Sequence, residues 1–280
     1  MASLRLATRH EVQDTPSEAR LVAVAYRLLA VGCWLLARSR LESGSVASQA
    51  TSETPFFRYD PAIIDAFPTI RAAAIRVVDI APGNPAALED EYRSQQSVTI
   101  ERLGRIAIAG IPSVAAWRRA FSRFGVKPTQ HRSAIESLLR RLSKQGHVPT
   151  INPLVDIGNL VSIRHALPVA VFDLDRISAP ITVQFAGGDE AFHGIGANGP
   201  DNPAPGEVIF VDAGGSVCAR RWCWRQSAES AAGDDSTRVL FVIEGHHESG
   251  AEDVLAAGRD VADLASRHLG ANVASFELLP

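Results

Sequence analysis

Apolar and polar positions divide the chain into a largely helical first part and a strand-rich second part. Before residue 168, apolar residues recur mainly at spacings of three and four, which is the period of a helix with one buried face. From residue 181 onward, short apolar or alternating stretches are separated by Gly, Pro, Asn and Asp, a pattern typical of strands and turns. Helices first and strands later, without regular alternation, predict an α+β fold.

The same pattern gives the individual elements. A strand is predicted around Ile75, Val77 and Val78, and the stretch "APGNPA" after it is a predicted turn. Helices are predicted at residues 87–97, 113–124, 131–146 and 151–167, with one amphipathic helix after Ser249. Strands are predicted at residues 181–186, 206–212, 216–224 and 237–245.

A polar stripe interrupts the apolar helix predicted at residues 151–167. Asn152, Asp156 and Asn159 follow one another at spacings of four and three, so they stack on one helical face. Asn and Asp are poor interior helix formers and cost free energy when they are buried without partners. The stripe therefore predicts either a hydrogen-bond network that ties the helix to a sheet, which suits Asn152 well, or a functional site.

Length, charge and cysteine content limit the possible classes of protein. The 280 residues, 46% of them hydrophobic, suit one large globular domain or a domain with small attachments. The net charge of −3 argues against an indiscriminate nucleic-acid binder but leaves room for a local basic face. Cys33, Cys218 and Cys223 show no metal-binding spacing, and their odd number does not suggest a disulfide framework. We therefore expect a reducing, cytoplasmic location.

The first fifty residues differ from the rest. The apolar run at residues 21–37 is short for a membrane span and contains Arg27, and its resemblance to a secretory signal is weak. We expect residues 1–50 to form an N-terminal extension, either disordered or a peripheral helix, with no membrane span. Residues 51–280 are then the main domain, including the C-terminal helix. Whether the extension belongs to the mature protein or is a signal stays open.

Familiar catalytic signatures are absent, including the nucleophile elbow, the phosphate-binding loop and the HExxH zinc motif. His246 and His247 have no third metal ligand nearby, so they predict a solvated strand end. The glycine-rich stretch at residues 187–200 does not precede a helix, which favours a loop lining a pocket over a nucleotide cradle. We expect neither a metal nor a cofactor.

Two basic segments are candidate RNA contacts. Four basic residues of the helix predicted at 131–146 lie mostly off its apolar face, namely Arg132, Arg140, Arg141 and Lys144. They form either an ordinary solvated helix face or a contact surface for phosphate groups. In the strand predicted at 216–224 and just beyond it, alternation places Arg221, Cys223 and Arg225 on one side. Trp222, Trp224 and Gln226 lie on the other side. Arginines and exposed aromatic rings suit RNA, although such pairs also serve simple packing.

The stretch "HRSAIESLLRRLSKQGHVPTINPLVDIGNLVSIRHALPVAVFDLDRI", followed by "GEVIFVD", "RRWCWRQS" and "TRVLFVIEG", resembles the B3/B4 domain. This domain is the editing module of the phenylalanyl-tRNA synthetase beta subunit and also occurs as free-standing proteins. The resemblance covers roughly residues 56–247 in matching order. It implies an α+β fold, with helices packed on a mostly antiparallel sheet or β-sandwich, and a pocket for the amino acid carried on the tRNA 3′ end.

The same resemblance implies a reaction, which is hydrolysis of the ester in wrongly charged aminoacyl-tRNA. Free-standing relatives are implicated in this reaction in trans, including removal of canavanine from arginine tRNA. We therefore expect a trans-editing deacylase whose partner is mischarged tRNA, with canavanyl-tRNA(Arg) as the best candidate substrate.

Position by position, the chain departs from the synthetase pattern. Gly158 and Asn159 stand in the places of a Thr-Asn pair, and Ala170 stands in the place of a histidine. Val242 stands in the place of a glutamate that reads a tyrosine hydroxyl, while Glu244 follows two positions later on the same strand face. These departures argue against discrimination of tyrosine.

Hydrolysis of an activated ester needs mainly a positioned water and stabilisation of the developing oxyanion. The resemblance implies a catalytic role for Asn159, helped by backbone N–H groups near Gly158, and His165 is a candidate proton carrier. The candidate substrate-binding residues are Asp156, Asn152, Glu190, Glu244 and Ser162. The candidate tRNA-binding residues are Arg132, Arg140, Arg141, Lys144, Arg221, Trp224 and Arg225.

Two other functions stay open. A non-catalytic tRNA- or RNA-binding module binds without ester turnover. A small-molecule ester or amide hydrolase that reuses the pocket does not depend on the basic residues. The oligomeric state does not follow from the sequence.

Overall fold

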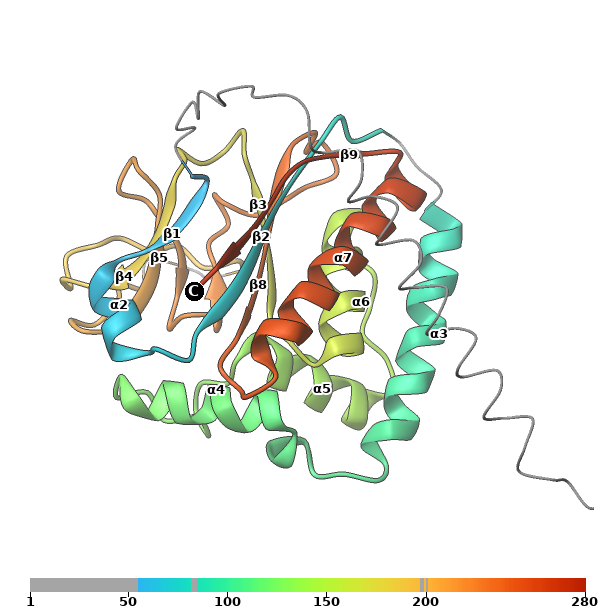
Figure 1. Ribbon diagram of the computed structural model, residues 1–280, viewed down its shortest axis with the longest axis horizontal. Helices are drawn as coiled ribbons and strands as arrows, with labels where there is room; N and C mark the ends of the chain where they lie inside the picture. The colour runs from blue at the N-terminus through green and yellow to red at the C-terminus, as the bar shows by residue number, and fades with distance from the viewer. Residues whose placement is uncertain (1–54, 82–84, 197–198, 200) are drawn as a thin grey trace, which may run out of the picture. The chain divides into compact units, whose positions relative to one another are not determined.

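The computed structural model describes residues 55–81, 85–196, 199 and 201–280. Within them lie two β-sheets and a set of helices, so the predicted α+β fold is confirmed (Figure 1). The extension predicted at residues 1–50, with its apolar run, lies outside the described residues. Among the described residues, no helix combines the length and apolar character that crossing a lipid bilayer needs.

The first sheet has five strands in the order β1-β4-β5-β6-β7. Its strands are β1 (Phe57–Tyr59), β4 (Ile181–Phe185), β5 (Val208–Val211), β6 (Val217–Arg220) and β7 (Arg225–Gln226). β1 pairs parallel with β4, and the remaining neighbours are antiparallel.

The second sheet has four antiparallel strands in the order β3-β8-β2-β9. Its strands are β3 (Val169–Asp173), β8 (Val239–Gly245), β2 (Arg71–Val78) and β9 (Asn272–Leu279). The register sets Val242 opposite Ala170 and Glu244 opposite Ala72. Because side chains alternate along a strand, Val242 and Glu244 point to the same face of this sheet.

Within the described residues, the five longer helices correspond to predicted ones, whereas the two short helical segments at residues 61–66 and 108–110 were not predicted. The helices are α2 (Pro61–Ala66), α3 (Pro85–Leu103), the 3₁₀ turn η1 (Ile108–Gly110), α4 (Pro112–Arg123), α5 (Ala134–Gln145), α6 (Pro153–His165) and α7 (Gly250–Leu269). Ser133 caps α5 by accepting a hydrogen bond from the Glu136 N–H, and Gly146 ends the helix in the left-handed conformation. The middle of the turn predicted at residues 81–86 lies outside the described residues, and its last two residues, Pro85 and Ala86, belong to α3.

The four-stranded sheet separates the five-stranded sheet from the helices α6 and α7 (Figure 1). The two sheets meet through contacts such as that of Phe172 with Phe210, whose ring centroids are 5.9 Å apart. On the other face, α6 approaches β3 at Gly158, where an added Cβ would lie 3.0 Å from Cγ2 of Val171. Residues of α6 therefore lie behind the four-stranded sheet, away from the space between the sheets.

Four strands of the described residues were not expected as separate strands, namely β1, β3, β7 and β9. The tail after Ser249, predicted as a helix alone, continues into the strand β9, which pairs with β2. The strand predicted at residues 216–224 is wrong beyond Arg220. Arg221 and Trp222 have φ of 44° and 58° and begin a turn, so the side-to-side alternation predicted there does not exist. The turn is held because the Arg221 N–H donates to Glu207 and the Trp222 N–H donates to the Val208 carbonyl.

Candidate functional site

A pocket of about 80 Å³ lies between the two sheets, closed on one side by the start of α5. Most of its wall is apolar, which is usual for a small-molecule site with a few convergent polar groups. The lining residues are Ala134, Pro168, Val169, Ala170, Phe210, Ala219, Trp222, Cys223, Trp224, Arg225, Gln226, Val242 and Glu244. Glu244 is the one carboxylic acid among them.

The carboxyl group of Glu244 is buried and held by two donors. The Tyr59 hydroxyl donates to Oε1 at 2.6 Å, and the indole Nε1 of Trp222 donates to the same oxygen at 2.8 Å. Burial raises the pKa of Glu244 to about 7, although the hydrogen bonds from Trp222 and Tyr59 act in the opposite direction. A carboxyl group with a strongly shifted pKa in a pocket is a candidate functional group.

Trp222 is aimed at Glu244 by an unusual backbone turn. Two consecutive non-glycine residues, Arg221 and Trp222, adopt left-handed conformations, each of which costs about 1 kcal/mol or more. The Trp222 ring is fixed edge-on against Trp117 and Phe67, with centroids 5.3 and 4.9 Å away. Strained backbone that the surrounding packing over-determines is common at binding sites. The turn places the indole N–H within hydrogen-bond distance of Glu244.

Cys223 also lines the pocket, next to Trp222. Burial raises the pKa of its thiol well above the usual range, and the nearby charge of Glu244 raises it further. The thiolate is the reactive form of cysteine, so a thiol that stays protonated at neutral pH is a poor nucleophile. The environment of Cys223 therefore does not favour covalent catalysis.

Three of the predicted tRNA-binding residues gather at the outer side of the pocket. The guanidinium groups of Arg221 and Arg225 lie 4.3 and 4.7 Å from the centre of the Trp224 ring. Trp224 and Arg225 also line the pocket, and Arg225 is exposed to solvent. The structure thus brings these residues together by a turn, although their predicted arrangement on a strand was wrong.

The predicted basic residues of α5 divide into two groups. Arg140 donates to the buried carboxylate of Glu136 at 2.9 Å, and Arg132 lies 4.0 Å from the same oxygen. Glu136 is two residues after Ala134, which lines the pocket. Arg141 and Lys144 are exposed on the same helix, and Arg141 donates to Gln145. Neither Arg141 nor Lys144 lines the pocket.

Asn152 and Ser162, two predicted substrate-binding residues, make hydrogen bonds within the fold. Asn152 caps α6 by accepting from the Val155 N–H at 2.9 Å, and its Nδ2 donates to the Ala232 carbonyl at 3.1 Å. The buried Ser162 hydroxyl donates to the Leu167 carbonyl at 2.6 Å. Asn152 therefore ties the start of α6 to the segment at Ala232, which is not part of a strand, so the predicted tie to a sheet is not formed.

Asp156 and Asn159 lie in the helical layer. Asp156 accepts a hydrogen bond from the Ile151 N–H at 2.9 Å. Burial raises the pKa of Asp156 to about 6, and the charge of Glu89 on α3 adds to the rise. Asn159 is half-buried and interacts with the Tyr92 side chain of α3. Neither residue lines the pocket between the sheets.

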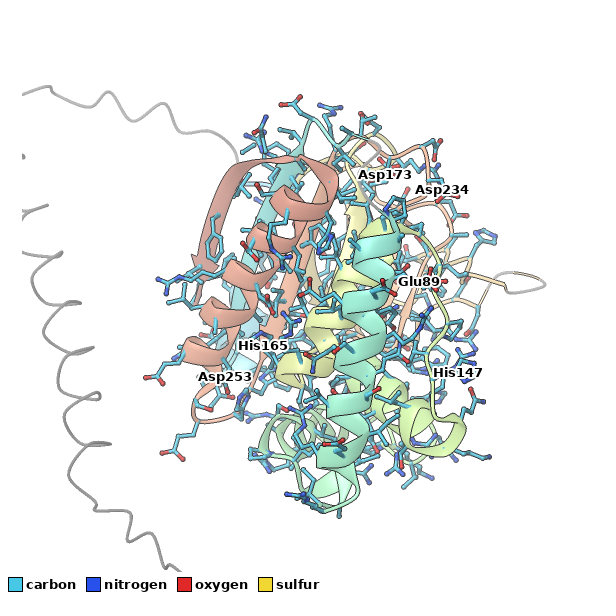
Figure 2. The ribbon with its side chains drawn as sticks, turned by 90° about the vertical axis from the view of Figure 1, so that its right-hand side faces the viewer. Glu89, His147, His165, Asp173, Asp234 and Asp253 are labelled. Carbon is cyan, nitrogen blue, oxygen red and sulfur yellow. The ribbon has the colours of Figure 1, made fainter. Side chains whose placement is uncertain are left out.

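His165 and Glu190 also lie outside the pocket lining. Nε2 of His165 is 3.0 Å from the Asp260 carboxylate of α7, and Figure 2 shows His165 in the helical layer. Glu190 accepts hydrogen bonds from the backbone N–H groups of Gly187 and Gly188 within its own loop. The catalytic roles predicted for Asn159, Gly158 and His165 remain predictions. Because none of the three lines the pocket between the sheets, we take the pocket around Glu244 as the candidate site.

Two lesser predictions need correction. The strand end at His246 and His247 is not solvated, since His246 is buried against Trp117 and Trp222 at centroid distances of 4.5 and 4.9 Å. Burial lowers the pKa of His246 to about 3. The described part of the glycine-rich loop does not line the pocket. Within the described residues, no group of three or more His, Cys, Asp or Glu is placed to hold a metal ion.

Tyr59 is the functional-site residue that the sequence did not reveal. It lies on β1, far along the chain from Trp222 and Glu244, in a stretch that the resemblance covers but to which it assigned no role. Tyr59 itself is one of several aromatic residues in "FFRYDP", a composition that is equally typical of a core strand.

A family model described as the B3/4 domain matches residues 116–260. This span contains every residue that lines the pocket, and Tyr59 lies before it. A solved structure, an N-terminal fragment of the phenylalanyl-tRNA synthetase beta subunit from Pyrococcus horikoshii, is similar at 12% identity with a TM-score of 0.42. The similarity covers 80% of this chain and 54% of that one, so the chain spans about half the length of that fragment. Among curated proteins, none matches the chain.

Proposed function

The chain belongs to the B3/4 domain family, and from this membership we propose that it hydrolyses the ester bond of mischarged aminoacyl-tRNA in trans. The proposal rests on the pocket between the sheets, where Glu244 is the one carboxyl group among the described lining residues. A buried carboxyl group with a pKa of about 7 is a suitable partner for a cationic or weakly basic side chain.

The exposure of the lining residues sets the direction in which a substrate enters. Arg225 is exposed to solvent, whereas Glu244 is buried together with Trp222. A pocket of about 80 Å³ is far too small for the body of a tRNA, so only the aminoacyl end of the substrate can enter it. The ester therefore stays near Trp224 and Arg225, and the amino-acid side chain reaches Glu244. This arrangement assigns Glu244 to selection of the substrate.

A weakly basic guanidine suits this site better than arginine does. The side-chain oxygen of canavanine lowers the basicity of its guanidine, so part of the free substrate is neutral near pH 7. A weak base enters an apolar pocket at a smaller desolvation cost than a permanent cation, and it then takes the proton of Glu244. Arginine keeps its charge in water and bears the full desolvation cost. We therefore propose canavanyl-tRNA(Arg) as the substrate.

The reaction itself needs a positioned water and little further chemistry, because an aminoacyl ester is already activated. Gln226 lines the pocket, and its Nε2 is fixed by the Val171 carbonyl at 2.8 Å. Its Oε1 makes no hydrogen bond within the described residues and is available to orient a water. The 2′-hydroxyl of the terminal adenosine is a further proton carrier within the substrate.

The decisive experiment is incubation with a panel of labelled mischarged tRNAs, including canavanyl-tRNA(Arg), with arginyl-tRNA(Arg) as the control. We expect rapid ester loss from canavanyl-tRNA(Arg) and slow loss from arginyl-tRNA(Arg). Glu244→Gln keeps the acceptor oxygen for Tyr59 and Trp222 but removes the charge, so we expect about a 100-fold lower kcat/KM for the canavanyl ester. Glu252→Gln, on the exposed start of α7, is the matched control.

Three results would contradict parts of this proposal. Absence of ester loss on every member of the panel would falsify the deacylase function and leave a binding module. Equal hydrolysis of free amino-acid esters and tRNA esters would favour a small-molecule hydrolase. An unchanged preference in Glu244→Gln would remove this residue from substrate selection while leaving the reaction intact.

A further inference from the structure

Positive charge is concentrated on the helices α4 and α5 and the segment between them. Residues 112–145 contain eight Lys or Arg and a single acidic residue, Glu136, although the whole chain has a net charge of −3. α4 contains Arg118, Arg119 and Arg123 and no acidic residue. A local basic surface on an otherwise acidic protein is a marker of an anionic partner.

The single carboxylate of this region is shared by three arginines. Oε1 of the buried Glu136 accepts from Arg118 at 2.8 Å and from Arg140 at 2.9 Å, and it lies 4.0 Å from Arg132. One carboxylate cannot neutralise three guanidinium groups, so the cluster keeps an excess of positive charge. The guanidinium-bearing side chains are 27%, 42% and 41% exposed, which leaves N–H groups free to bind an anion from solvent.

Arg119 and Arg123 extend this charge along α4. Both are exposed, and within the described residues neither has a carboxylate partner; Arg123 lies over the Phe67 ring at 5.5 Å. They line two shallow grooves, one on each side of α4. One groove also contains Arg118 and Ser122, and the other also contains Thr69. Such grooves with several N–H donors suit phosphate groups.

Both helices also contact the wall of the pocket between the sheets. Trp117 of α4 lies against Trp222, which donates to Glu244. At the start of α5, the Ala134 N–H donates to the Cys223 carbonyl at 2.8 Å, and both residues line the pocket. The basic surface and the wall of the pocket are therefore connected through α4 and the start of α5.

We propose that Arg118, Arg119, Arg123, Arg132 and Arg140 form a phosphate-binding surface for the acceptor arm of the tRNA whose 3′ end enters the pocket. This inference rests on the proposed deacylase function and names the contact surface of its substrate. Arginine binds phosphate oxygens in pairs, and the five side chains span both helices. Glu136 is a positioning residue, because it holds Arg118 and Arg140 in place without touching the RNA.

The test is binding of a deacylated tRNA(Arg) transcript at several salt concentrations, measured by fluorescence anisotropy. The variants are Arg119→Ala, Arg123→Ala and the double variant, all at exposed positions where folding is not at risk. Arg259→Ala is the matched control, since Arg259 is exposed on α7 in the helical layer and its loss changes the net charge equally. We expect each α4 substitution to weaken binding about fivefold and to reduce the slope of log Kd against log salt by about 0.7–0.9. The control stays at the wild-type value.

The possible results distinguish failure of the phosphate-binding surface from failure of the deacylase function. The proposed phosphate-binding surface is wrong if the double variant keeps the wild-type affinity and salt slope. It is also wrong if Arg259→Ala loses as much affinity as the α4 variants. No binding of the transcript by the wild type overturns it as well. Hydrolysis of the mischarged panel is measured with the same proteins. Salt-dependent binding that the double variant loses, together with no ester loss in the wild type, supports the surface and overturns the deacylase function.

Discussion

Two buried carboxyl groups, Glu244 and Asp156, lie on opposite sides of the four-stranded sheet and have raised pKa values of about 7 and about 6. Asp156, in the helical layer, accepts a hydrogen bond from the backbone of Ile151, five residues away. Glu244 accepts from Tyr59 and Trp222, whose side chains come from different parts of the chain, and it faces a pocket. The two groups share the shift of pKa but not the surroundings.

This difference shows which observation marks the site. A buried carboxyl group has a raised pKa wherever burial outweighs its partners, so the shift alone does not distinguish a structural residue from a functional one. A cavity beside the group, and donors that only the folded chain brings together, are additional conditions. Glu244 meets both, and within the described part of the chain Asp156 does not line the pocket between the sheets.

The largest expected effect is on the pH dependence of stability. Both folded-state pKa values lie above the ordinary values of 4.5 for Glu and 3.8 for Asp. At a pH between the ordinary and the folded-state pKa of either group, the folded state therefore binds more protons than the unfolded state. The stability contribution is therefore full at low pH and is lost as pH rises, from about 4.5 to 7 for Glu244 and from about 3.8 to 6 for Asp156. Between pH 4 and pH 8 the wild type should lose about 3 kcal/mol of unfolding free energy through Glu244, and Glu244→Gln should not show this loss.

Urea unfolding of the wild type, Glu244→Gln and Asp156→Asn between pH 4 and pH 8 measures this effect. We expect Asp156→Asn to recover less, because its shift is smaller, and to complete its change at a lower pH. Identical pH profiles for the wild type and Glu244→Gln would show that this carboxyl group is not protonated in the folded state near neutral pH.

The helices could be predicted from the sequence, whereas the site could not be assembled from it. The helical period predicted α4 and α5 because each buries one apolar face, and the long apolar run predicted α6, which is buried on most sides. The sequence placed Asn152 within α6, whereas it is the N-cap residue in front of the helix. The turn at Arg221 and Trp222 was missed because local alternation resembles a strand, while contacts with Glu207 and Val208 impose left-handed backbone. Alternation also cannot reveal that Tyr59 meets Glu244, since 185 residues separate them.

Gly158 tests the role of the helical layer, because its predicted catalytic role conflicts with its place behind the four-stranded sheet. In Gly158→Ala the new methyl lies 3.0 Å from Cγ2 of Val171, a stiff and buried side chain. Overpacking costs about 1–3 kcal/mol, and the better helix propensity of Ala offsets up to about 1 kcal/mol of this. We expect a net loss of about 1–2 kcal/mol in urea unfolding and wild-type kcat/KM at 25 °C. Full stability with lost hydrolysis would instead support the role implied by the resemblance.

The smallest effect sharpens the account of Glu244 itself. Tyr59→Phe removes the hydroxyl that donates to Oε1 at 2.6 Å, one of the two hydrogen bonds that lower the pKa of Glu244. Without it the carboxylate is less favoured, so the pKa rises further above 7, by about one unit for one hydrogen bond to a charged group. The midpoint of the pH–rate profile for the canavanyl ester should move to higher pH by this amount. Tyr92→Phe removes the buried hydroxyl near Asp156 and should leave that midpoint unchanged, because its effect is confined to the helical layer. A midpoint that moves in Tyr92→Phe and not in Tyr59→Phe would place the titrating group behind the sheet.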